Sequence, residues 1–97
     1  MISPHYDMIN IEQNDKTFDL FYDAEKAGFM EYNVNGNILE IIHTEVFKEF
    51  GGKDLGLELV KAAVELAEKN NYKIVASCPY AKKIIDATPE FKVLLAK

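Results

Sequence analysis

The chain has 97 residues, of which 48% are hydrophobic and 28% charged, and its formal net charge is −5. This composition is ordinary for a globular protein, and the length predicts one domain covering residues 1–97. The acidic balance argues against a nucleic-acid partner or an anionic membrane surface, because both attract clustered Lys and Arg.

The sequence has one cysteine, Cys78, so no internal disulfide can form and a reducing compartment suits the chain. The N-terminus shows no signal-peptide pattern, and no apolar run approaches the roughly 20 residues that a membrane span needs. The two histidines are far apart, and no metal-ligand spacing is present. We therefore expect a cytoplasmic protein that is neither embedded in a membrane nor dependent on a metal.

Alternating apolar and polar residues predict four strands in the first half of the chain. After a loose lead-in at residues 1–7, these strands are expected at residues 9–12, 18–22, 27–34 and 38–46, with a polar break at 23–26. Asn35-Gly36-Asn37 is the strongest hairpin signal, since Asn-Gly suits the positive φ angles of a tight turn. The run ILEII at residues 38–42 predicts a central strand that is covered on both faces.

Apolar residues at helical spacing predict a long helix at residues 55–70, which ends at two asparagines that tolerate a left-handed cap. Residues 72–77 predict a fifth strand, and Pro79 starts a second helix that reaches residue 87. Residues 91–95 form a short apolar tail, strand or helix, that should pack on the core. The predicted fold is mixed α/β (α+β), in the order β-β-β-β-α-β-α.

A glycine-bearing loop lies between the fourth strand and the long helix, where residues 43–56 read HTEVFKEFGGKDLG. A strand, a glycine loop and a helix N-terminus in this order can hold a phosphate. The first amides of a helix lack intrahelical partners and carry partial positive charge. These glycines alone are a weak signal.

Two further segments make the signal more specific: HTEV at residues 43–46 closes the fourth strand, and SCPY at residues 77–80 follows the fifth. With Lys83, Pro89 and Phe91, they resemble the small single-domain branch of the GNAT superfamily of N-acetyltransferases. The likeness covers residues 9–95. It implies that the fourth and fifth strands splay apart. It also implies that acetyl coenzyme A binds with its pantetheine arm in the gap between these strands and its pyrophosphate on the loop. The implied reaction is transfer of the acetyl group to an amine of a small molecule or protein.

The resemblance implies a set of cofactor-binding residues around the loop and the second helix: Val46, Gly51, Gly52, Lys53, Asp54, Leu55, Gly56, Cys78, Tyr80 and Lys83. The superfamily loop usually reads Arg/Gln-x-x-Gly-x-Gly/Ala, and Asp54 stands where the middle glycine is usual. Its carboxylate would repel a diphosphate ~4 Å away by about 1 kcal/mol in water, which Lys53 could offset. Alternatively, Asp54 lies in the first helical turn, where the dipole favours it, and binding is retained. Tyr80 and Lys83 flank the cofactor, or are simply a half-buried Tyr and a solvated Lys.

Three residues are candidates for catalysis. Pro79 at the first helical position makes Cys78 the N-cap, where unpaired amides lower the pKa of a thiol. Cys78 is then either a transient acetyl acceptor or a small, buried, inert cysteine. His43 ends a buried strand and is either a structural histidine or a base. Glu45 shares its side of the strand and is the alternative base.

Two functions therefore remain open. The first is an N-acetyltransferase in which a deprotonated amine attacks the thioester directly. The second is a non-catalytic coenzyme A-binding or protein-interaction module on the same fold, which the small size and Asp54 favour. The acceptor cannot be read from the sequence, although an acidic protein suits a cationic amine. Oligomeric state is open, with a monomer as the expectation.

Overall fold

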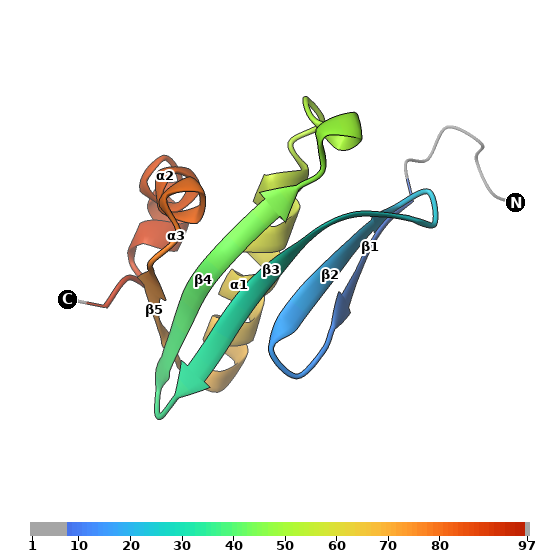
Figure 1. The fold of residues 1–97 in the computed structure, drawn as a ribbon. Coiled ribbons are helices and arrows are strands. Elements are labelled where there is room, and N and C mark those ends of the chain that lie inside the picture. The colour runs from blue at the N-terminus through green and yellow to red at the C-terminus, as the bar shows by residue number, and fades with distance from the viewer. Residues whose placement is uncertain (1–7, 97) are drawn as a thin grey trace, which may run out of the picture.

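The computed structural model describes residues 8–96, so the predicted lead-in lies outside the described part. Five strands form one sheet in the order β1-β2-β3-β4-β5 (Figure 1). The elements are β1 Ile9–Gln13, β2 Thr17–Tyr22, β3 Glu25–Asn35, β4 Ile38–Val46, the 3-10 helix η1 Lys48–Phe50, α1 Leu55–Asn70, β5 Lys73–Ala76, α2 Pro79–Asp86 and α3 Pro89–Lys92. This arrangement confirms the predicted mixed α/β fold, and η1 was not predicted.

Tight turns join the antiparallel strands β2, β3 and β4. The predicted Asn-Gly hairpin is confirmed, since Gly36 has a φ of 63° between β3 and β4. The turn before β3 is shorter than the polar break predicted at residues 23–26. Asp23 and Ala24 both adopt positive φ angles, of 51° and 73°, so β3 already begins at Glu25. Two left-handed residues match the twist of the flanking strands, which is why so short a connection suffices.

Helix α1 covers one face of the sheet, and no helix lies over β3 and β4 on the face turned to the viewer in Figure 1. The prediction that β4 is covered on both faces is therefore wrong. Ile41 is fully buried, but its neighbour Ile42 is 47% exposed. The cause is a β-bulge: Tyr32 pairs with Ile41 and Glu31 pairs with His43, which leaves Ile42 unpaired. An apolar run through a bulge need not mean burial on both faces.

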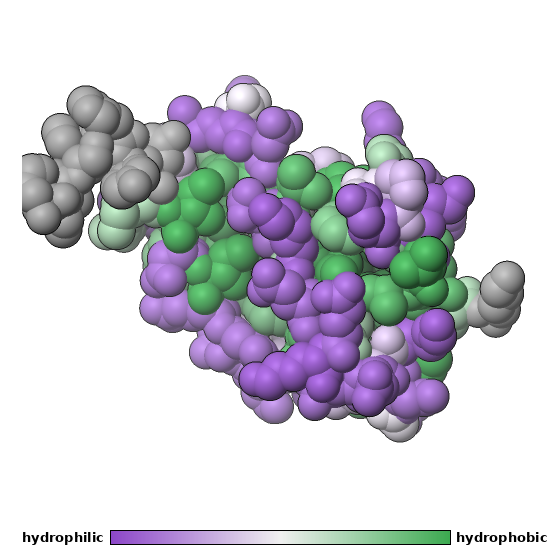
Figure 2. Space-filling model, turned by 180° about the vertical axis from the view of Figure 1, so that it is seen from behind, coloured by the Kyte–Doolittle hydropathy of each residue, from purple (hydrophilic) through white to green (hydrophobic). Residues whose placement is uncertain are grey.

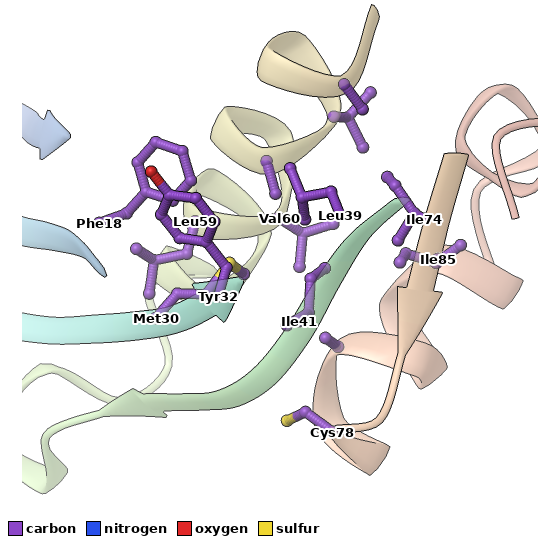
Figure 3. Close-up of a cluster of buried hydrophobic side chains, with 14 of the residues drawn as sticks. Phe18, Met30, Tyr32, Leu39, Ile41, Leu59, Val60, Ile74, Cys78 and Ile85 are labelled. Carbon is purple, nitrogen blue, oxygen red and sulfur yellow. The ribbon is translucent and has the colours of Figure 1, made fainter. Parts of the chain in front are cut away.

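The core lies between α1 and the covered face of the sheet (Figure 3). Leu59 and Val60 of α1 are fully buried, and the rings of Phe18 and Tyr32 stack with centroids 4.7 Å apart. Seen from behind, hydrophilic side chains run between hydrophobic patches on the face of the molecule that carries α1 (Figure 2). As predicted, α1 ends where Asn71 turns left-handed, with a φ of 60°. Among the described residues, no helix is long and apolar enough to cross a membrane.

The strands β4 and β5 are parallel, but they pair only over Ile38–Ile41 and Lys73–Ala76. β5 ends where this pairing ends, whereas β4 continues to Val46, and the chain that follows β5 turns away from β4 into α2 (Figure 1). The two strands thus part at this end, as the resemblance implied. The C-terminal tail is helix and then strand-like: after α3, Leu95 pairs with Ile74 along the outer edge of β5. The divergence opens a gap between β4 and the start of α2.

Candidate functional site

A cleft of about 420 Å³ opens where β4 ends and α1 begins. The end of β4, the loop after η1, the first residue of α1 and one side chain of α2 surround it. Its lining residues are Thr44, Glu45, Val46, Phe50, Gly51, Gly52, Asp54, Leu55 and Tyr80. Segments that are distant in the sequence thus meet at the place where β4 has parted from β5.

Most residues singled out in the sequence reach this cleft, and the exceptions lie close by or on another surface. Lys53, Gly56, Cys78 and His43 are not among the lining residues. Lys83 belongs to a separate hollow of about 700 Å³ beside α2, which it lines with Lys82, Asp86 and neighbouring residues. Thr44 and Phe50 line the cleft without having been predicted as site residues. Thr44 stands within the quoted HTEV motif, and strand alternation after the bulge turns it inwards; Phe50 carried no signal.

Aromatic contacts hold the loop after β4 against β2. The ring of Phe50 meets the ring of Tyr22 edge-on, with centroids 6.0 Å apart. The ammonium of Lys53 lies 5.1 Å from the centroid of the same Tyr22 ring. Lys53 is therefore drawn towards Tyr22 of β2, and it is not among the residues that line the cleft.

Asp54 precedes α1 as its N-cap residue, so the expectation that it lies in the first helical turn is wrong. Its φ of 57° and ψ of 32° are left-handed, whereas N-cap residues usually have extended backbone angles. Its side chain makes no capping hydrogen bond. The first amides of α1 thus remain available to an anion in the cleft, while the carboxylate adds a negative charge to the same wall.

Gly56 lies directly beneath Tyr80. A Cβ atom on Gly56 would clash with the Tyr80 hydroxyl and the adjacent ring carbons. The absence of a side chain therefore lets the Tyr80 ring rest on the first turn of α1 and form a wall of the cleft. Gly56 shapes the cleft by admitting Tyr80.

His43 and Glu45 form a pair on the open face of the sheet. The Nε2 atom of His43 is 3.3 Å from Oε1 of Glu45, and the two side chains are 51% and 50% exposed. The expected shared side is confirmed, but the description of His43 as the end of a buried strand is wrong, because the bulge turns it outwards. Glu45 also lines the cleft, so the pair stands at its mouth. The ring of Phe29 lies 5.7 Å from the imidazole.

Cys78 is the N-cap of α2, as predicted, and it is only 5% exposed. Its sulfur points towards β4 in Figure 3. Burial raises the pKa of the Cys78 thiol, but the amide of Ala81, the hydroxyl of Thr44 and the amide of Tyr80 lower it. The lowering effects prevail, and the pKa falls below the ordinary value of 9.0. The chain thus places a buried thiol, with a pKa below its ordinary value, beside the gap between β4 and β5.

Thr44 is 6% exposed, and its hydroxyl has no hydrogen-bond partner among the described residues. The hydroxyl is near enough to Cys78 to favour the thiolate, yet no hydrogen bond of ordinary geometry joins the two groups. A buried polar atom without a partner is rare in native structures and calls for an explanation.

Backbone amides complete the cleft. The amide of Phe47 donates to the carbonyl of Ala27 on β3, at 2.8 Å. Because amides alternate in direction along a strand, the amide of Val46 points away from β3, towards the gap. Between residues 8 and 96, no group of three or more His, Cys, Asp or Glu side chains could hold a metal ion. The site can therefore bind through amides, one hydroxyl and one thiol.

A model of the GCN5-related N-acetyl-transferase family matches residues 17–94, which include every element from β2 to α3. A GCN5-like protein from Staphylococcus aureus, known from an NMR solution structure, is 32% identical. The match has a TM-score of 0.73 and covers 90% of this chain and 87% of the other. Among curated proteins, no relative was found.

More distant structures share the fold. The ribosomal-protein-alanine N-acetyltransferase of Brucella melitensis is 17% identical with a TM-score of 0.61, covering 84% of this chain and 63% of that one. The PaiA N-acetyltransferase of Thermoplasma acidophilum, solved with coenzyme A, is 24% identical with a TM-score of 0.53, covering 57% and 35%. The chain spans less than two thirds of these two proteins. The family match and the Staphylococcus structure nevertheless extend over most of its length, and the chain belongs to the GCN5-related N-acetyltransferase family.

Proposed function

We propose that this chain is an N-acetyltransferase that binds acetyl coenzyme A in the cleft at the end of β4 and transfers the acetyl group to an amine. The observation that carries the proposal is the convergence of the loop, the open N-terminus of α1 and the divergence of β4 from β5 around one cleft. The proposal takes residues 1–97 as one domain, active as a monomer in the cytoplasm, with no nucleic-acid partner.

The pyrophosphate of the cofactor would lie at the start of α1. Gly51 and Gly52 bring backbone close to the cleft, and the first amides of α1 are left uncapped by Asp54. Such amides carry the positive end of the helix dipole and bind phosphate groups. Leu55 and Tyr80 supply the apolar wall. Lys83 is not included in this contact set, because it lines the other hollow.

The acetyl end would lie in the gap between β4 and β5, near Val46 and Cys78. Bound acetyl coenzyme A supplies an acetyl thioester there. The amide of Val46 points into this gap and can donate to the oxygen that becomes negative as the amine nitrogen bonds to the acetyl carbon. The carbon–sulfur bond then breaks, and the coenzyme leaves as a thiolate that takes up a proton.

The amine approaches from the open face, where His43 and Glu45 stand at the mouth of the cleft. An amine attacks only when it is deprotonated, and the pair offers two bases for that proton. The 3.3 Å contact between the two side chains and the position of Glu45 in the lining support a role for either one as the base. Their high exposure allows the proton to pass to water.

Cys78 adds a second route in two steps. Its thiolate first attacks the acetyl carbon and displaces coenzyme A as a thiolate that takes up a proton. The deprotonated amine then attacks the acetyl-Cys78 thioester, and the Cys78 thiolate leaves. Its lowered pKa and its position at the gap support this route. A catalytic role requires that Cys78→Ala abolish acetyl transfer while the affinity for acetyl coenzyme A stays unchanged. Transfer at the wild-type rate by Cys78→Ala would reduce Cys78 to a structural residue.

The competing function is a coenzyme A-binding or protein-interaction module without catalysis. Asp54 favours it, because a carboxylate in the phosphate wall opposes cofactor binding. A thermal-shift titration with acetyl coenzyme A separates the cases, since a ligand at a hundred times its Kd stabilises a protein by about 2.7 kcal/mol. Thioester consumption is then followed with polyamines, lysine peptides and small amines. Binding without turnover would support the module, and absence of binding would overturn both functions.

A further inference from the structure

Among the described residues, the Thr44 hydroxyl is the one buried side-chain oxygen or nitrogen without a hydrogen-bond partner. Thr44 is only 6% exposed, and it is one of the residues that line the cleft at the end of β4. Leaving such a group unpaired destabilises the folded protein, whereas a valine of the same shape would not do so. The hydroxyl therefore either stays unpaired, at a cost in stability, or forms its hydrogen bond with a bound ligand.

Three observations favour a ligand. Thr44 is one of the residues that line the cleft. It lies beside the thiol of Cys78, at the N-terminus of α2, so two polar groups converge on one spot. The β-bulge at Ile42 shifts the inward and outward alternation of β4 by one residue, so that Thr44 faces inwards and His43 faces outwards. The chain thus presents a hydroxyl on the inner side of β4 and a base pair on the outer side.

We propose that Thr44 is a binding residue for the acyl-carrying end of the cofactor, and that its hydroxyl donates a hydrogen bond to a carbonyl oxygen of the bound molecule. This inference rests on the proposed function. Coenzyme A carries amide carbonyls in its pantetheine arm, and acetyl coenzyme A adds the thioester carbonyl. Both are the same kind of acceptor, and affinity measurements with the two molecules distinguish them.

The test is Thr44→Val in the full chain, with affinities for coenzyme A and acetyl coenzyme A measured by calorimetry. We expect Kd to rise about 5- to 10-fold, because the bound carbonyl loses its donor. An equal rise for both molecules assigns the hydroxyl to a pantetheine amide, and a rise for acetyl coenzyme A alone assigns it to the thioester. Thr44→Ser keeps the hydroxyl and should retain most of the affinity.

The melting temperature of the ligand-free protein provides a readout that does not depend on activity. Thr44→Val should melt at the wild-type temperature or above it, since no existing hydrogen bond is lost. Thr88→Val is the matched control, because the Thr88 hydroxyl donates to the carbonyl of Ile84 at 3.0 Å, in a residue that does not line the cleft. It should lower the melting temperature and leave both Kd values unchanged.

Two results would overturn the inference. One is an unchanged Kd for both molecules in Thr44→Val while the wild type binds them. The other is a loss of ligand-free stability as large as that of Thr88→Val, which would show that the hydroxyl already has a partner. If Thr44→Val does not fold, Thr44→Ala supplies the Kd comparison for both molecules, and Thr44→Ser remains the control that keeps the hydroxyl. Failure of the wild type to bind either molecule would instead refute the proposed function.

Discussion

Replacing Asp54 by glycine should strengthen binding of acetyl coenzyme A and leave the stability of the fold almost unchanged. Asp54 is the residue at which this chain departs from the usual phosphate loop, and its carboxylate belongs to the wall of the cleft. The structure adds that its φ of 57° is one that glycine adopts freely. The substitution removes a charge and a backbone constraint at the same time.

The expected magnitudes follow from these two effects. A left-handed residue with a Cβ atom costs roughly 1–2 kcal/mol, and less for aspartate, which tolerates this conformation. Glycine in turn destabilises the protein by about 0.4–1 kcal/mol, because it increases the conformational entropy of the unfolded chain. The net change in the free energy of unfolding should therefore stay within about 0.5 kcal/mol. Removing a unit charge ~4 Å from a phosphate is worth about 1 kcal/mol in water and more when partly desolvated, so Kd should fall at least about fivefold.

Calorimetric titration of wild type, Asp54→Gly and Asp54→Asn with coenzyme A separates charge from backbone. Asparagine keeps a residue that tolerates left-handed angles, so both variants should bind equally well if charge is the cause. The gain should also shrink as salt is added, because screening acts over about 10 Å at 0.1 M ionic strength. Unchanged affinity in both variants would refute the reasoning. A gain in Asp54→Gly alone would assign the effect to backbone freedom.

Three further predictions concern other parts of the site. Gly56→Ala should push the Tyr80 ring out of the cleft and so raise the Kd for acetyl coenzyme A. The melting temperature should stay unchanged, since alanine favours a helix over glycine by about 0.8–1.0 kcal/mol. An unchanged Kd would contradict this role of Gly56. The thiolate absorbance of Cys78 should titrate with a midpoint pKa below 9.0, and a midpoint at or above 9.0 would contradict this. Because the folded pKa is the lower one, the part of the stability difference between wild type and Cys78→Ala that depends on pH should be complete above pH 9.0 and be lost as pH falls through the folded pKa. Of His43→Ala and Glu45→Gln, the variant that lowers kcat about 100-fold with an unchanged Kd identifies the base, and equal kcat in both would exclude the pair from proton transfer.

Much of the fold could be predicted because its signals are local. Period-two alternation, an Asn-Gly turn and a helical stripe each depend on a few consecutive residues, and all three appear where they were expected. The N-cap position of Cys78 was readable for the same reason, since Pro79 marks the start of a helix. The family resemblance rested on two short motifs, HTEV and SCPY, which the structure places on either side of the gap between β4 and β5.

The tertiary structure decided which of these residues meet and which way they face. The bulge that exposes Ile42 and His43 depends on pairing with β3, a contact between residues distant in sequence. Lys53 turns towards Tyr22, and Gly56 is covered by Tyr80, for reasons that no spacing along the loop contains.

The loop from His43 to Gly56 shows the division most clearly. Composition and motif indicated a phosphate-binding loop and marked Asp54 as its departure from the family pattern. Only the folded chain shows Asp54 left-handed and non-capping, and only it shows the Thr44 hydroxyl buried without a partner. Local sequence determines backbone preferences, whereas burial and the satisfaction of polar groups depend on all the elements packed around a residue.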